Sequence, residues 1–301
     1  FYDVLNSLMK KRGVGVYVTG SNSQMLSKDV ATNFRDRGIE IRVWPLSFAE
    51  YRLARPGLDA SAAWDNYLMY GGMPRAVTAK DDAERATYLE GLFRYVYNRD
   101  IIERYNLKDD YVLDNAIKAV SSSVGSLTNP TRLADAMKTL LKVNVSAPTL
   151  SKYLGYLEEA FAIETVKLYS GKAKRELNYY QKTYDEDVCF NSIRCMNGRY
   201  DLSHNLENIV YNELVYMGYT LQVYYDGKEE IDFVALKDGK QYYIQVAYSV
   251  AEEKAYNREF RALNNMDNSC QKILISNDEL DYSTSTVRHI KLSDFLKMES
   301  L

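Results

Sequence analysis

The stretch Glu229–Ser249, EEIDFVALKDGKQYYIQVAYS, constrains the fold more than any other part of the sequence. Two strand-like runs, IDFVAL and QYYIQVAYS, flank the tetrapeptide KDGK, and an Asp-Gly pair between such runs is a strong signal for a β-hairpin. Asp232 lies near the start of the first run, and Gln245 lies inside the second. Nucleases commonly hold a metal ion with an acid on one strand and an acid or amide on the next.

The segments around this hairpin have a definite order along the chain. A helix is expected at 206–219, followed by three strands, a second helix at EEKAYNREFRALNNM and a strand at QKILISN. The order helix, three strands, helix, strand is that of a restriction-endonuclease-like core, so we expect such a domain at 200–301. In that fold a Glu on the first helix, an Asp on the second strand and an acid-x-Lys on the third hold Mg²⁺ and activate water.

In this sequence Glu207, Asp232 and Gln245 occupy those three places, with Glu230 on the same strand face as Asp232, and Ala247 stands where the lysine would be. One interpretation is a degenerate site with Asp232 as the tentative metal ligand and no cleavage activity. The alternative is an active Mg²⁺-dependent DNA nuclease. Residues 201–301 contain 10 Lys and Arg against 17 Asp and Glu, and this acidic balance favours the degenerate site.

The N-terminal residues show the pattern of an α/β sheet. Residues 1–12 predict an amphipathic helix, VGVYV (14–18) predicts a buried strand, and IEIRVWPL (39–46) predicts another strand. Ser47 and Glu50 form a capping box that begins the next helix. We expect 1–54 to be half of an α/β core, and because half a sheet is poorly stable, we expect further sequence before Phe1.

The central residues predict helices and then a winged helix. Residues 55–126 have a helical pattern, and 127–190 show two helices followed by a β-hairpin, the order of a winged helix-turn-helix. Its basic side chains would contact DNA phosphates in a salt-dependent way. They are Lys152, Lys167, Lys172, Lys174, Arg175 and Lys182. The alternatives are a protein-interaction module or a plain DNA-binding module.

These pieces together resemble the bacterial and archaeal AAA+ superfamily ATPases that carry a C-terminal domain of unknown function (family 4143). The matching stretches, in the family's order, are YVTGSNSQMLS, VWPLSFAEY, YLMYGGMP, YVYNRDIIERY, TLSKYLGYLEEAFAI, LENIVYNEL, EIDFVA and YYIQVAYS. The resemblance implies a mixed α/β and α+β multidomain protein with a partial AAA+ core, a helical lid, a winged helix and a nuclease-like domain. It also implies that the full-length protein binds ATP and Mg²⁺.

The resemblance assigns roles to residues of the N-terminal part. The strand 14–18 would be the sensor 1 strand, after which Thr19, Ser21 or Asn22 would orient the water that attacks the γ-phosphate. Arg37, with Arg35 nearby, would be an arginine finger. A polar turn and a solvated basic loop are the plainer alternatives. No GxxxxGK[ST] pattern occurs in the 301 residues, so we expect this chain to be a C-terminal portion that does not hydrolyse ATP by itself.

Composition bears on whether the protein binds nucleic acid, crosses a membrane or holds zinc. The net charge of -3 gives no indication of nucleic-acid binding. No apolar run approaches the roughly 20 residues that span a bilayer. Cys189, Cys195 and Cys270 lack zinc-site spacing, so we expect reduced thiols and a cytoplasmic protein. A protein partner could bind the acidic C-terminal domain, and an oligomer is compatible with the sequence. The motif YGGMP (70–74) predicts a tight loop with a structural role.

Overall fold

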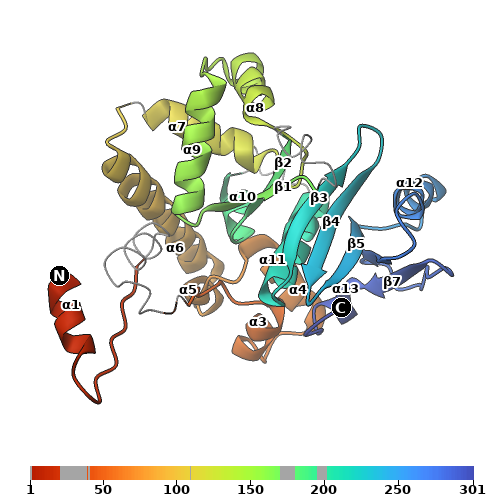
Figure 1. Ribbon diagram of the computed structural model, residues 1–301, viewed down its shortest axis with the longest axis horizontal. Coiled ribbons are helices and arrows are strands. Elements are labelled where there is room, and N and C mark those ends of the chain that lie inside the picture. The colour runs from red at the N-terminus through yellow and green to blue at the C-terminus, as the bar shows by residue number, and fades with distance from the viewer. Residues whose placement is uncertain (1, 21–38, 40, 109, 170–179, 195–201) are drawn as a thin grey trace.

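The computed structural model describes residues 2–20, 39, 41–108, 110–169, 180–194 and 202–301 (Figure 1). The described residues up to Ser121 form helices joined by irregular segments, and α1 stands away from the rest of the molecule. Its helices are α1 (Tyr2–Met9), α3 (Phe48–Ala54), α4 (Ala60–Tyr70), α5 (Pro74–Val77), α6 (Asp82–Tyr95), the π-helix η1 (Val96–Glu103) and α7 (Asp110–Ser121).

The two strands expected at 14–18 and 39–46 are not formed, and this part of the prediction is wrong for the described residues. Both segments are irregular, and Tyr17, Ile39 and Val43 are 94%, 92% and 88% exposed. A strand in a sheet needs a neighbour to accept its backbone hydrogen bonds. Neither segment pairs with the other among the described residues, so the apolar pattern alone does not make a sheet. The expected helix at 1–12 is confirmed as α1, and the capping box of Ser47 with Glu50 begins α3 as expected.

The central residues form the predicted order of two helices and a hairpin. The elements are α8 (Pro130–Ala136), the π-helix η2 (Met137–Leu141), α9 (Ala147–Glu159), β1 (Ile163–Lys167), β2 (Gln181–Asp185) and α10 (Cys189–Arg194). Ser146 accepts a hydrogen bond from the backbone N–H of Thr149 and so caps α9, as its sequence predicts. Strands β1 and β2 pair antiparallel, with Val166 opposite Lys182.

The last hundred residues form one mixed sheet with helices on both faces. The elements are α11 (Leu202–Tyr216), β3 (Thr220–Tyr225), β4 (Glu230–Lys237), β5 (Lys240–Ala247), α12 (Glu253–Asn264), β6 (Gln271–Ser276), β7 (Val287–Lys291) and α13 (Leu292–Phe295). The strand order is β3-β4-β5-β6-β7, antiparallel from β3 to β5 and parallel from β5 to β7. The predicted order of helices and strands is therefore confirmed.

The hairpin that opens the sequence argument is also confirmed. Asp238 and Gly239 connect β4 to β5 with positive φ angles of 52° and 75°, as a two-residue turn of this hand requires. Alternate residues of β4 then face opposite sides of the sheet. Phe233 packs in the cluster with α11, whereas Val234 packs in the cluster that contains Phe260 of α12.

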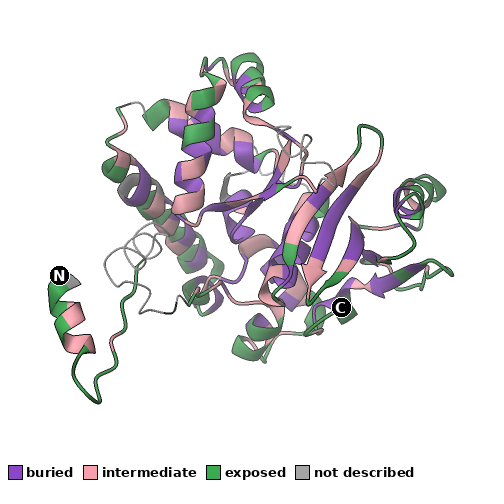
Figure 2. Ribbon diagram, viewed as in Figure 1, coloured by how far each residue is buried: buried purple, intermediate pink, exposed green. Residues whose placement is uncertain are grey.

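One hydrophobic core joins the central and C-terminal parts of the chain. Tyr67 of α4, Tyr184 of β2, Leu214 of α11 and Phe233 of β4 belong to a single cluster of buried residues. Figure 2 shows this buried material running from the helices of the central part into the sheet. A boundary near residue 200 therefore separates sequence segments that share one core.

Candidate functional site

The three residues that the sequence singles out as nuclease-like do come together. Glu207 on α11, Asp232 on β4 and Gln245 on β5 are all buried. The backbone N–H of Asp232 donates to Gln245 Oε1 at 3.2 Å, and Asp232 Oδ2 accepts from the N–H of Val246 at 2.9 Å. Gln245 Nε2 in turn donates to Glu259 Oε2 of α12 at 2.7 Å. Both polar atoms of the Gln245 side chain are therefore used inside the protein.

A lysine from the central part lies at the centre of these acids. Lys182 of β2 is 1% exposed, and its Nζ lies 2.8 Å from Glu207 Oε1, 2.8 Å from Glu230 Oε1 and 2.8 Å from Asp232 Oδ1. An ammonium group has three N–H donors, and three carboxylates surround it. We call these four residues the lysine cage. The expectation that Lys182 contacts DNA from the surface of the wing is wrong, because its ammonium is enclosed by the protein.

Two further residues shape the cage. The hydroxyl of Tyr184, two positions after Lys182 on β2, donates to Glu207 Oε1 at 2.6 Å, and its ring stacks on Tyr211 of α11 at a centroid distance of 4.3 Å. Gly125 has a φ of 70°, and a Cβ there would lie 3.2 Å from Glu207 Oε2. A glycine therefore allows the backbone to adopt this conformation close to the carboxylate.

The charges in the cage change the protonation of its members. Burial alone lowers the pKa of Lys182, but the carboxylates of Asp232, Glu207 and Glu230 outweigh burial and raise that pKa well above its usual range. Burial, together with the charge of Asp232, raises the pKa of Glu207 to about 7 although Lys182 lowers it. Three acids around one ammonium leave an excess of negative charge, so the cage favours protons on both residues.

The residues of the cage do not fit a resident Mg²⁺ ion, which a restriction-endonuclease-like site would hold. The oxygen atoms converge on a point that Lys182 Nζ takes, and N⁺–H···O⁻ contacts of about 2.7–2.9 Å are ordinary, whereas Mg²⁺ needs oxygens at about 2.0–2.1 Å. Throughout the part of the chain that the structure describes, no group of three or more His, Cys, Asp or Glu side chains could hold a metal ion. The lysine, which the family pattern gives no role here, is the signal that sequence reasoning missed.

Asparagines of α11 fix the helix to the strand that carries the lysine. Asn208 is fully buried; its Oδ1 accepts from the N–H of Asp185 at 2.7 Å, and its Nδ2 donates to the carbonyl oxygen of Asp185 at 2.8 Å. One turn later, Asn212 Nδ2 donates to the carbonyl oxygen of Glu186 at 3.1 Å. These bonds satisfy the backbone polar groups of Asp185, at the end of β2, and of Glu186, just after it. They hold β2 in a fixed position on α11, and so place Lys182 beside the acids.

The segment between the N-terminal part and α3 is attached to this same body. In the connecting segment, residues 41–47, the Nη2 of Arg42 bonds to the carboxylate of Glu164 on β1 and lies 2.7 Å from Glu186 Oε2 after β2. The guanidinium also lies 3.7 Å from the ring centroid of Trp44. Burial raises the pKa of Glu186 to about 7, although Arg42 lowers it.

Further along, α11 and α4 hold the end of the connecting segment. The N–H of Phe48 donates to Glu213 Oε1 at 2.8 Å, and the hydroxyl of Tyr67 donates to the carbonyl oxygen of Leu46 at 2.9 Å. Glu213 therefore accepts from one of the free N–H groups in the first turn of α3. The structure thus connects the segment to both the central and the C-terminal parts.

The motif YGGMP has a clear role in this attachment. Gly71 has a φ of 69°, and a Cβ there would lie 1.5 Å from Asp187 Oδ1. Gly72 donates its N–H to Asp187 Oδ2 at 2.7 Å, accepts from the N–H of Leu46 at 2.9 Å, and a Cβ there would lie 2.0 Å from the Leu46 carbonyl oxygen. The two glycines let α4, the connecting segment and the buried Asp187 carboxylate meet. The predicted structural role of the loop is confirmed.

The other sequence-predicted residues lie apart from the cage. Lys152 on α9 and Lys167 at the end of β1 are exposed, and Thr19 is exposed in the irregular segment after α1. The remaining ones fall outside the described residues. They are Ser21, Asn22, Arg35, Arg37, Lys172, Lys174 and Arg175.

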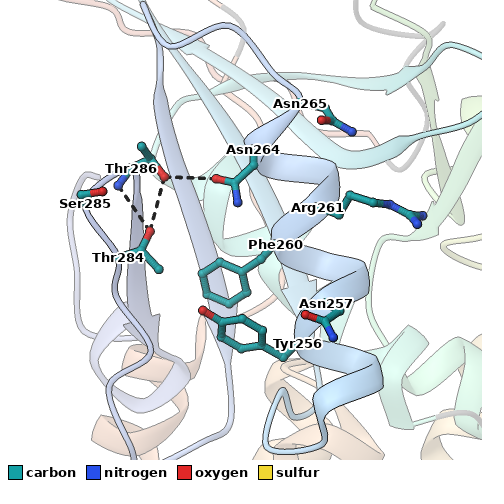
Figure 3. A pocket seen from close by; sticks show the side chains of 9 residues that line it. All are labelled: Tyr256, Asn257, Phe260, Arg261, Asn264, Asn265, Thr284, Ser285 and Thr286. Carbon is teal, nitrogen blue, oxygen red and sulfur yellow. Dashed lines mark hydrogen bonds between the residues drawn. The ribbon is translucent and has the colours of Figure 1, made fainter.

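A second candidate is an open groove of about 430 Å³ between α12 and the loop before β7 (Figure 3). Several of its polar side chains pair with neighbours. Asn264 Oδ1 accepts from Thr286 Oγ1 at 3.1 Å, and Arg261 Nε lies 3.1 Å from Glu229 Oε1. The groove has no set of buried polar groups that converge on one point, as the lysine cage has. Among the described helices, none is both long and apolar enough to cross a membrane.

Comparison with known families divides the chain into three parts. The family described as "AAA domain" matches residues 1–52, a domain of unknown function (DUF8612) matches 61–191, and a domain of unknown function (DUF4143) matches 203–295. The predicted lid and winged helix thus fall within one family match.

Two curated relatives match along most of the chain. An uncharacterized protein of Haemophilus influenzae is 32% identical over 280 residues, which cover 91% of this chain and 68% of the relative. An uncharacterized protein of Methanocaldococcus jannaschii is 27% identical over 295 residues, which cover 89% of this chain and 64% of the relative. The chain spans about two thirds of the length of these relatives. It belongs to the family of the Haemophilus influenzae protein, and within that family its N-terminal residues are AAA-like and its C-terminal residues form a DUF4143 domain.

Proposed function

We propose that this chain is the C-terminal portion of an AAA-type ATPase in which residues 48–301 move as one body when the nucleotide domain changes state. The observation that carries the proposal is the attachment of the connecting segment. Arg42 binds both β1 and the end of β2, while Phe48 binds Glu213 of α11. A movement of the AAA part would therefore be transmitted to the central and C-terminal parts together.

In this proposal the C-terminal domain has a nuclease-like fold without nuclease activity. Lys182 occupies the point on which the acids converge, and Ala247 replaces the lysine that would orient water. The domain then serves as a binding and support module, and a protein partner is a suitable ligand for its acidic surface.

The ATPase part is tested with the full-length gene product. We expect it to bind and hydrolyse ATP in the presence of Mg²⁺, and Asn22→Ala to lose hydrolysis while ATP binding remains, because a sensor residue orients the attacking water. Asn6→Ala, on α1, is the matched control and should hydrolyse ATP normally. A full-length protein that does not bind ATP would overturn the proposal.

The binding part is tested separately on this chain. Lys152 and Lys167 are exposed on α9 and β1, and with Lys172, Lys174 and Arg175 of the sequence they support DNA contact through the predicted winged helix. We expect fluorescence anisotropy to detect duplex DNA binding at low salt that weakens with added salt and with Lys152→Ala/Lys167→Ala. Affinity that does not respond to the double substitution would assign the binding to another surface and favour a protein partner for the central part.

A further inference from the structure

The acids of the lysine cage and its cation come from different parts of the chain. Glu207, Glu230 and Asp232 lie within the DUF4143 match, whereas Lys182 lies within the DUF8612 match. The C-terminal domain therefore carries three carboxylates directed at one point, and it does not supply the cation that balances them. Buried carboxylates that face one another without a cation are strongly unfavourable.

The position of the cation is fixed by packing and not only by charge. Lys182 is on a strand of which Thr183, Tyr184 and Asp185 are also buried, so the side chain cannot leave the cage by rotating into solvent. Asn208 holds the backbone of β2 at Asp185. The packed strand β2 therefore holds the Lys182 ammonium beside the three acids. The ammonium takes the place that a bound cation would have there.

We infer that Lys182 is a built-in cation that holds the place of a divalent metal ion, and that truncating its side chain turns the three acids into a divalent-cation site. The surroundings support oxygen ligation of such an ion. The free space left by truncation would be lined by Glu207 Oε1, Glu230 Oε1 and Asp232 Oδ1, with the Tyr184 hydroxyl beside them. Hard divalent cations prefer oxygen ligands of this kind. The inference does not depend on the proposed ATPase function.

The test compares wild-type protein with Lys182→Ala, using Mn²⁺ as the probe. We expect Mn²⁺ to raise the Tm of Lys182→Ala by about 5 °C and to leave the Tm of the wild type unchanged. Electron paramagnetic resonance should show one bound Mn²⁺ only in the variant. Lys182→Ala/Asp232→Asn should lose that binding, and Lys152→Ala, which removes an exposed lysine, should behave as the wild type does.

A second probe replaces the missing ammonium itself. Alanine retains the Cβ of Lys182, so n-propylammonium supplies the missing atoms, whereas tetramethylammonium has the same charge but no N–H donors. We expect n-propylammonium to raise the Tm of Lys182→Ala and to compete with Mn²⁺, and tetramethylammonium to do neither. Competition would show that both cations bind at the one point.

Lys182→Ala could fail to fold, because three acids would face one another. Lys182→Ala/Glu207→Gln removes one positive and one negative charge, so it keeps the net charge of the wild-type cage and should fold. We expect it to bind one Mn²⁺ more weakly than Lys182→Ala. A folded variant without any Mn²⁺ response would overturn the inference, as would Mn²⁺ binding to the wild type that Asp232→Asn abolishes. If neither variant folds even when Mn²⁺ or n-propylammonium is present during refolding, the inference also fails.

Discussion

The backbone N–H of Gly72 donates a 2.7 Å hydrogen bond to the carboxylate of Asp187, which lies 115 residues further along the chain. On its other side, Gly72 is so close to the Leu46 carbonyl oxygen that a Cβ would come within 2.0 Å of it. We predict that Gly72→Ala lowers the free energy of unfolding by at least about 2 kcal/mol, because the backbone carbonyl cannot move without breaking its bonds. Urea denaturation measures this change.

Gly91 provides the matched control for that substitution. It lies exposed on α6, and a Cβ there would meet nothing within 4 Å. Gly91→Ala should therefore raise the free energy of unfolding by about 0.5–1 kcal/mol, because alanine favours a helix. Equal destabilisation by both substitutions would contradict the role assigned to Gly72.

A second prediction concerns the asparagine that binds β2. Because Asn208 both accepts from and donates to the backbone of Asp185, Asn208→Asp places a carboxylate oxygen against a carbonyl oxygen in the core. We expect a loss of about 3 kcal/mol in the free energy of unfolding at pH 8. The loss should shrink at low pH, where the new carboxyl carries a proton and donates again. Asn257→Asp, an exposed position on α12, should change stability by less than about 0.5 kcal/mol.

The sequence predicts the C-terminal fold well because its signals are local. The turn at Asp238–Gly239 and the alternation in β4 both come from residues that are neighbours along the chain. The capping box of Ser47 and Glu50 is equally local. The order of helices and strands assigns Glu207 to the first helix and Asp232 to the second strand of a nuclease-like site, and the structure does bring them together.

The sequence does not predict the lysine cage, because the partners of Lys182 lie 25 to 50 residues away in another segment. A lysine in a basic hairpin is normally exposed, so the composition of this hairpin does not indicate that Lys182 is buried. The reason for its burial appears only in the structure. Lys182 and Tyr184 alternate on β2, and a strand covered on both faces has no solvent-facing position for a lysine. The expected strands 14–18 and 39–46 failed for the opposite reason, because their periodicity says nothing about whether a partner strand is present.

A third prediction concerns Arg42 and the connecting segment. Arg42→Ala removes both ion pairs, to Glu164 and Glu186, so the segment should open more often. We expect chymotrypsin to cleave after Leu46 at least about 10-fold faster in the variant than in the wild type, which corresponds to about 1.4 kcal/mol of lost local stability. Arg94→Ala, an exposed position on α6, is the control and should leave the cleavage rate unchanged. An unchanged rate in Arg42→Ala would mean that Leu46 and Phe48 suffice to hold the segment.

The last prediction uses the pH dependence of stability. Burial raises the pKa of Glu213 to about 7, although the N–H of Phe48 lowers it, whereas a Glu in the unfolded chain titrates near 4.5. The folded protein therefore binds more protons than the unfolded one between pH 4.5 and 7, and the stability that Glu213 contributes is present below that window and is lost as the pH rises through about 7.

Glu213→Gln tests this directly, because its Oε1 can still accept the N–H of Phe48 while the side chain no longer titrates. We expect the wild type and the variant to have similar free energies of unfolding near pH 5. At pH 8 the variant should be more stable by an amount on the order of 2 kcal/mol, because it buries no charge. Urea denaturation at several pH values gives both curves. Parallel curves across pH 5–8 would show that the Glu213 carboxyl is not the group that titrates, and would shift attention to Glu186, whose pKa burial also raises to about 7.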